Sequence, residues 1–291
     1  MVVMEVKLLA PYGYCSGVVL AMKKALDAKK EHPDSNVYLL GNLVHNEEAV
    51  RELRDAGLLL IDERESNLLD ALLDLNRGDV VVFSAHGHPA SYDDLAELKG
   101  LVLVDATCPF VKENTLEGQE CGRPLIYAGV KGHLECEAFL ANCPDAVFLD
   151  AKDGSFNYLK VKGKKDDPIL ICQTTLSLKE VERAKAEVLK FFPAATIGKE
   201  RCLSTKSRQE AVLNLNEEEV DALIVLGSSS SNNSVKLAEI GKGKGIPTFL
   251  CLGIDEVSRL DLSSFAKVAL CSGASTSREA VLRAKEYLES L

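Results

Sequence analysis

Hydrophobic residues in this chain occur in short runs that alternate with longer stretches of mixed polarity. Runs such as "DVVVFSA" and "DALIVLG" show no polar alternation, which is typical of strands covered on both faces of a sheet. In the longer stretches, apolar residues recur at helical spacing. Because such strands and helices alternate from end to end, the pattern predicts parallel α/β units.

The positions of the expected elements follow from these runs. We expect strands at Val2–Leu9, Val37–Leu40, Leu58–Ile61, Val80–Phe83, Leu101–Val104, Leu125–Ala128, Val147–Leu149, Ile169–Ile171, Leu223–Leu226, Thr248–Cys251 and Val268–Cys271. We expect helices directly after "PYGYCSG" and at Glu47–Ala56, Ser91–Leu98, Leu178–Phe192, Thr205–Leu215, Asn233–Gly241 and Arg278–Leu291.

Polar residues gather at the carboxyl ends of the expected strands. The segments are "GNLVHN", "FSAHGH", "VDATCP", "YAGVKGHLE", "ICQTTLS", "VLGSSSSNNS" and "LCSGASTS". Ligands of open α/β sheets bind outside the carboxyl ends of the strands. These segments, rich in His, Cys, Ser, Thr and Asn, therefore predict one shared cleft.

Composition narrows the classes of partner. A length of 291 residues predicts two or three compact units. The net charge of −10 argues against nucleic acid, and it requires that an anionic substrate be held by local donors such as helix N-termini, hydroxyls and histidines. No apolar stretch approaches the roughly 20 residues of a membrane span. The N-terminus has no basic leader, so we expect a cytoplasmic protein with reduced cysteines.

Three of the nine cysteines stand at turns that lead into helices: Cys15, Cys108 and Cys202, spaced 93 and 94 residues apart. A helix N-terminus favours the thiolate that binds metals. Three converging thiolates suit a cubane iron–sulfur cluster that keeps one iron open, or a zinc ion completed by histidine or water. A small residue that merely fits a tight turn is the plainer alternative for each cysteine.

The segments "GYCSGV", "VHN", "FSAHG", "DATCP", "KGHLE", "QTTLS", "C-x-x-T-x-x-RQ" and "GASTS" occur in the order seen in the LytB/IspH family. The chain resembles these iron–sulfur 4-hydroxy-3-methylbut-2-enyl diphosphate reductases from Gly13 to about Glu279. The resemblance implies an α/β fold of three modules with mostly parallel sheets, arranged as a trefoil around a central cleft. The expected modules are residues 14–108, 109–198 and 199–291, the last packed with the N-terminal strand 1–13.

The resemblance also implies roles for individual residues. Cys15, Cys108 and Cys202 would hold one 4Fe–4S cluster and leave one iron open. Glu135 would deliver protons, with Thr175 beside it near the substrate hydroxyl. The implied substrate contacts, mainly to its diphosphate, are His45, His86, His133, Thr175, Ser231, Asn232, Asn233 and Ser275.

The implied reaction is the reductive dehydroxylation of (E)-4-hydroxy-3-methylbut-2-enyl diphosphate to isopentenyl and dimethylallyl diphosphate, with electrons from a donor such as ferredoxin or flavodoxin. Three departures concern the substrate pocket. Asn232 stands where the family usually has serine, "GHLECEAFLA" replaces "GHPEVEGT", and His88 replaces a small apolar residue. The alternatives are a paralogue acting on a related allylic or phosphorylated substrate and a non-catalytic iron–sulfur sensor or binding protein for phosphorylated metabolites.

Overall fold

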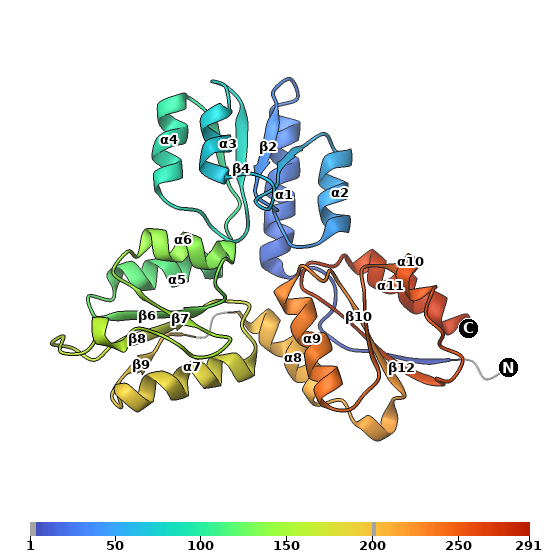
Figure 1. Ribbon diagram of the computed structural model, residues 1–291. Helices are drawn as coiled ribbons and strands as arrows, with labels where there is room; N and C mark the ends of the chain where they lie inside the picture. Colours follow the sequence, from blue (N-terminus) through green and yellow to red (C-terminus); the bar gives the residue numbers. More distant parts are fainter. Residues whose placement is uncertain (1–3, 200–201) are drawn as a thin grey trace. The chain divides into compact units, whose positions relative to one another are not determined.

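The computed structural model describes residues 4–199 and 202–291. Its strands are β1 (Glu5–Leu8), β2 (Val37–Leu40), β3 (Leu59–Ile61), β4 (Val80–Phe83), β5 (Val102–Asp105), β6 (Leu125–Gly129), β7 (Val147–Asp150), β8 (Ile169–Cys172), β9 (Thr196–Ile197), β10 (Ala222–Leu226), β11 (Thr248–Cys251) and β12 (Lys267–Ser272). In the described residues they form three four-stranded sheets, ordered β1-β12-β10-β11, β3-β2-β4-β5 and β7-β6-β8-β9 (Figure 1). Every strand pair within these sheets is parallel, which confirms the predicted α/β class.

Helices connect the parallel strands. They are α1 (Ser16–Glu31), α2 (Glu47–Asp55), α3 (Leu68–Asp74), α4 (Ser91–Lys99), α5 (Pro109–Glu120), α6 (Leu134–Asn142), α7 (Leu178–Phe191), α8 (Leu203–Leu213), α9 (Asn232–Gly243), α10 (Ile254–Val257) and α11 (Arg278–Glu289), with short 3₁₀ turns at Tyr158–Lys160 and Glu217–Glu219. No helix in the described part of the chain has both the length and the apolar character that crossing a bilayer requires.

The chain divides into two compact units. The first contains the residues up to Val18 together with Val44–Glu52 and Leu203–Leu291. The second contains Val19–Leu43 and Leu53–Cys202. The first unit holds the sheet of β1, β12, β10 and β11, and the second holds the other two sheets.

The core of the first unit lies on both faces of its sheet. Ile224 and Leu226 of β10 pack in a cluster with residues of α10 and α11. Leu223 and Val225 of the same strand pack in a second cluster with residues of α8 and α9. Because successive side chains of a strand point to opposite faces, both sets must be apolar, and the run "ALIVL" is the result.

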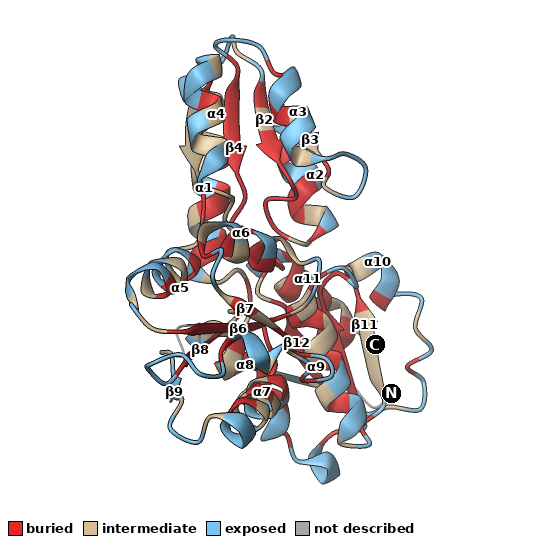
Figure 2. Cartoon of the chain, turned by 60° about the vertical axis from the view of Figure 1, so that its left-hand side comes forward, coloured by how far each residue is buried: buried red, intermediate tan, exposed pale blue. Residues whose placement is uncertain are grey.

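The second unit repeats this arrangement on each of its sheets. In β6, Ile126 and Ala128 pack with α7, whereas Leu125 and Tyr127 pack on the side of α6. In β4, Phe83 belongs to a cluster with residues of α3 and α4. Figure 2 shows the strands mostly in the colour of buried residues, while the helices are buried along one side only.

Most expected elements are present with ends shifted by one or two residues, and the described residues also contain strand β9 and helices α3, α6 and α10, which were not expected. Strand β9 was not expected because both of its residues are exposed and no apolar run marks it. Helix α8 begins at Leu203, not at Thr205, so that Cys202 directly precedes it. The first strand begins at Glu5 within the described residues, and the expected start at Val2 lies outside them.

Candidate functional site

Each of the three candidate cluster cysteines immediately precedes the first residue of an α-helix. Cys15 precedes α1, Cys108 precedes α5, and Cys202 precedes α8. The sulfur of Cys15 accepts a hydrogen bond from the backbone N–H of Val18, at 3.5 Å. All three cysteines therefore stand at the N-terminal end of a helix, which carries partial positive charge.

The backbone around two of these cysteines is held by tertiary hydrogen bonds. The Cys15 amide donates to the carbonyl of Ala274 at 2.9 Å, and the Gly13 amide donates to the hydroxyl of Ser272 at 3.1 Å. Gly13 has φ +83°, and a Cβ there would lie 3.2 Å from the Cβ of Arg278, so the turn requires glycine. The Cys108 amide donates to the carbonyl of Ala85 at 3.0 Å.

Four other cysteines are poor candidates for metal binding. Burial raises the pKa of the thiol to about 12 for Cys136 and Cys271, and to about 11 for Cys143 and Cys251. Such thiols stay protonated near neutral pH, whereas a metal ligand must be the thiolate. The remaining two, Cys121 and Cys172, are half-buried.

In the first unit, the predicted anion-binding residues lie at the carboxyl ends of β10 and β12. Ser231 caps the N-terminus of α9, and Asn232 and Asn233 form its first turn. The side chain of Asn233 is 4% exposed, and neither its amide nitrogen nor its amide oxygen has a hydrogen-bond partner among the residues that the structure describes. A buried amide without a partner costs free energy, which a polar ligand bound at this helix N-terminus would offset.

The His45 segment lies against the same strand ends. The hydroxyl of Ser275, which follows β12, donates to the backbone carbonyl of His45 at 3.3 Å. The hydroxyl of Ser230, which follows β10, donates to the carboxylate of Glu47 at 3.3 Å. The first unit therefore brings together five of the predicted substrate contacts: His45, Ser231, Asn232, Asn233 and Ser275.

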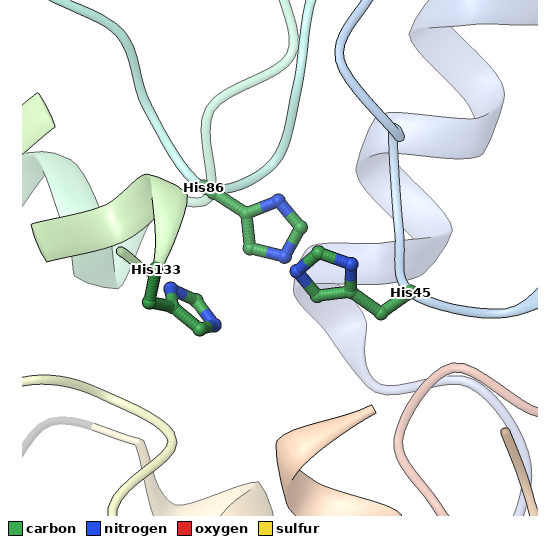
Figure 3. Close-up of side chains that lie close together, drawn as sticks. All are labelled: His45, His86 and His133. Atoms are coloured by element: carbon green, nitrogen blue, oxygen red, sulfur yellow. The ribbon is translucent and has the colours of Figure 1, made fainter. Parts of the chain in front are cut away.

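In the second unit, His86 and His133 lie side by side at the ends of β4 and β6. Their ring centroids are 5.4 Å apart, edge to face. His133 caps α6, and its Nδ1 accepts a hydrogen bond from the Glu135 amide at 3.1 Å. The neutral ring therefore carries its proton on Nε2, which makes that nitrogen a donor. Figure 3 shows the segments from which His86, His133 and His45 extend.

Glu135, in the first turn of α6, is a buried carboxyl group with only 2% of its surface exposed. Burial raises its pKa to about 7, although hydrogen bonds from Thr174 and Tyr127 act in the opposite direction. The Tyr127 ring, stacked on Phe139 at 3.8 Å, forms part of the apolar surroundings. A carboxyl group with this pKa can hold and release a proton near neutral pH.

Thr174 is the threonine that contacts Glu135. Its backbone N–H donates to one carboxylate oxygen and its hydroxyl to the other, each at 2.7 Å. The hydroxyl of Thr175, the threonine that the family resemblance implies, accepts a hydrogen bond from the Gln173 side chain at 2.8 Å. Gln173 also accepts from the Val130 amide at 2.8 Å. Sequence reasoning missed both Thr174 and Gln173, although "QTTLS" contains them, and the role of Thr175 stays a prediction.

Replacing Thr174 with valine tests this contact. We expect kcat to fall about ten- to a hundredfold, the usual effect of losing one hydrogen bond to a charged group. In the wild type, the hydrogen bond from the Thr174 hydroxyl lowers the pKa of Glu135. Its removal should raise that pKa, so turnover should decline at a higher pH in the variant. Thr175→Val is the matched control in steady-state kinetics. A larger loss in that control than in Thr174→Val would make Thr175 the partner of the carboxyl group.

Comparison with known proteins shows which family the chain is similar to. The family model described as "LytB protein" matches residues 6–289. The 4-hydroxy-3-methylbut-2-enyl diphosphate reductase of Lysinibacillus sphaericus is 34% identical, over 98% of this chain and 88% of the relative. The enzyme of the same name from Bacillus subtilis is also 34% identical, over 98% of this chain and 91% of that relative.

A solved structure shares the fold. The E-1-hydroxy-2-methyl-but-2-enyl-4-diphosphate reductase from Plasmodium falciparum superposes with a TM-score of 0.82 and 25% sequence identity. The superposition covers 98% of this chain and 87% of that one. Since the family model and the curated relatives both span nearly the whole chain, the protein belongs to the LytB family.

Proposed function

We propose that this chain reductively dehydroxylates (E)-4-hydroxy-3-methylbut-2-enyl diphosphate to isopentenyl and dimethylallyl diphosphate, the last step of the non-mevalonate isoprenoid pathway. The curated relatives carry the name of this reductase. The observation that carries the proposal is that Cys15, Cys108 and Cys202 each directly precede a helix. A 4Fe–4S cluster held by these three thiolates would supply the electrons and one iron without a protein ligand.

The residues of the first unit are suited to the diphosphate end of the substrate. The N-terminal turn of α9 offers backbone N–H groups, and the buried Asn233 side chain has donors without partners. Ser231 and Ser275 add hydroxyls, and His45 adds an imidazole. In a protein of net charge −10, such local donors bind an anion without a large basic surface.

The residues of the second unit are suited to proton delivery. With a pKa of about 7, Glu135 carries its proton in a substantial fraction of molecules near neutral pH. We propose that it donates this proton to the departing hydroxyl, with Thr174 holding both carboxyl oxygens in place. His133 Nε2 and His86 would add donors beside it.

We further propose that the electrons come from a small cytoplasmic donor such as a ferredoxin or flavodoxin. The decisive test is anaerobic reconstitution of the full chain, with iron and sulfide measured per chain, followed by turnover with a chemical reductant. Four irons per chain and formation of both products are the expected results. A chain that binds zinc in place of iron, or that turns over no substrate when its iron is complete, would contradict the proposal.

His45→Asn is expected to weaken substrate binding more than it slows the chemistry. Losing one charge-assisted hydrogen bond to the diphosphate costs about 1.5–3 kcal/mol, which would appear mostly in KM. The measurement is steady-state kinetics of His45→Asn and of a control variant, His32→Asn, which changes the residue directly after α1. A large fall in kcat with KM unchanged would place His45 at the reacting end of the substrate.

A further inference from the structure

Arg208 on α8 is a buried cation beside the turn that carries Cys15. Only 3% of its surface is exposed. One terminal nitrogen, Nη2, donates to the backbone carbonyl of Gly13 at 2.6 Å. The other, Nη1, donates to the carbonyl of Ser204 at 3.2 Å and also contacts the Ser204 hydroxyl.

These two contacts join two parts of the chain that matter for the cysteines. Gly13 lies two residues before Cys15, and Ser204 lies two residues after Cys202. Gly13 and Arg208 are 195 residues apart in sequence, so the contact is purely tertiary. A single planar guanidinium group therefore holds the Cys15 turn against the first turn of α8.

The opposite side of the same turn is held as well. The Gly13 amide donates to the hydroxyl of Ser272, a residue with no exposed surface. Next to Ser272, burial raises the pKa of the Cys271 thiol to about 12, although the nearby charge of Arg208 opposes this rise. Cys271 therefore stays a neutral thiol beside the guanidinium group. The peptide groups of Gly13 are bonded on both sides before any ligand is present.

We propose that Arg208 is a positioning residue, which sets the Cys15 turn against the start of α8 so that the site is preorganised for its cluster. This inference rests on the proposed function, in which Cys15 and Cys202 are cluster ligands. Without the guanidinium contacts, the turn would become ordered only when the cluster binds. The cost of this ordering would reduce the affinity of the chain for the cluster.

Arg208→Lys is the sharpest variant because it keeps the positive charge. A lysine ammonium is a compact charge on a flexible stem and lacks the rigid fork that reaches both carbonyls. If charge alone mattered, lysine would restore the wild-type behaviour. Ser272→Ala is a smaller change that removes the hydrogen bond between the Gly13 amide and the Ser272 hydroxyl, on the other side of the same turn. It replaces Arg208→Lys as the test variant if the lysine variant folds poorly. Val212→Ala, in the buried face of α8, controls for loss of core packing.

Two measurements on the full chain test the proposal. In the cluster-free protein, hydrogen exchange at the Gly13 and Cys15 amides should be about ten- to a hundredfold faster in Arg208→Lys than in the wild type. After anaerobic reconstitution, release of iron to a chelator should be about tenfold faster in Arg208→Lys, as expected for a lost charge-assisted hydrogen bond. Ser272→Ala should change both in the same direction, and Val212→Ala should change neither.

The outcomes separate this inference from the proposed function. In one outcome, Arg208→Lys and Ser272→Ala show fast hydrogen exchange in the turn and yet release iron at the wild-type rate. That result would overturn the cluster role of Arg208 and leave the reductase proposal intact. Equal effects in Val212→Ala would reduce Arg208 to a general stabilising residue. A wild-type chain that binds no iron would overturn the proposed function itself, and the cluster role of Arg208 with it.

Discussion

Cys108→Ser is expected to abolish stable assembly of the four-iron cluster. Cys108 occupies the N-cap position of α5, and Pro109 takes the first helical position. Serine keeps the turn and the size of the side chain, but its hydroxyl stays protonated near neutral pH. Only two of the three proposed thiolates would then remain, and iron and sulfide per chain after anaerobic reconstitution should fall far below the wild-type values.

Cys143→Ser is the matched control for this experiment. Cys143 stands at the C-terminal end of α6, where it is buried and its thiol donates to the backbone carbonyl of Thr115 at 3.7 Å. This variant should keep both its iron and its activity. Wild-type iron content and turnover in Cys108→Ser would remove Cys108 from the ligand set and would return the plainer interpretation of a small residue in a tight turn.

Glu135→Gln should reduce turnover by a factor on the order of 10²–10⁴, the usual range for losing a positioned acid. Glutamine keeps the shape of the side chain and one oxygen that accepts from Thr174, but it cannot transfer a proton. Cluster content and substrate affinity should stay near normal, because the variant leaves the proposed cysteines and diphosphate contacts unchanged. Steady-state kinetics and iron content of the same preparation provide the measurement.

The pH dependence gives this prediction a second readout. An acid works only while it is protonated, so wild-type turnover limited by Glu135 should decline as the pH rises through about 7. Glu135→Gln should lose that decline. Tyr127, the other acidic group at this carboxyl, provides no substitute proton at this pH, because burial raises its pKa well above the ordinary value.

The same variant separates an enzyme from a sensor. A non-catalytic iron–sulfur sensor needs its cluster and its ligand site, but no residue that delivers protons. Near wild-type kcat in Glu135→Gln would remove Glu135 from the mechanism and would leave it as a buried residue that stabilises the first turn of α6. A mild loss of stability alone would then be the whole effect.

The amino-acid sequence by itself determined the class of the fold and the turns that carry the cysteines. A strand covered on both faces needs an unbroken apolar run, and the runs at Val80–Phe83 and Leu223–Leu226 fall on β4 and β10, whose residues are all buried. Proline and glycine beside Cys15 and Cys108 mark turns because of their own backbone preferences. These properties are local, so they are readable without a structure. The module boundaries at residues 108 and 198 stay a prediction.

Only the tertiary structure decided which neighbouring side chains act together. In "QTTLS", periodicity cannot say which threonine faces Glu135, because the contact spans 39 residues and depends on β6 and β8 lying side by side. The contact of Arg208 with Gly13 spans 195 residues and depends on how α8 packs on the sheet that receives β1. Hydrophobic spacing reports which side of its own element a residue occupies. The order of strands in a sheet and the packing of helices on it decide what that residue meets.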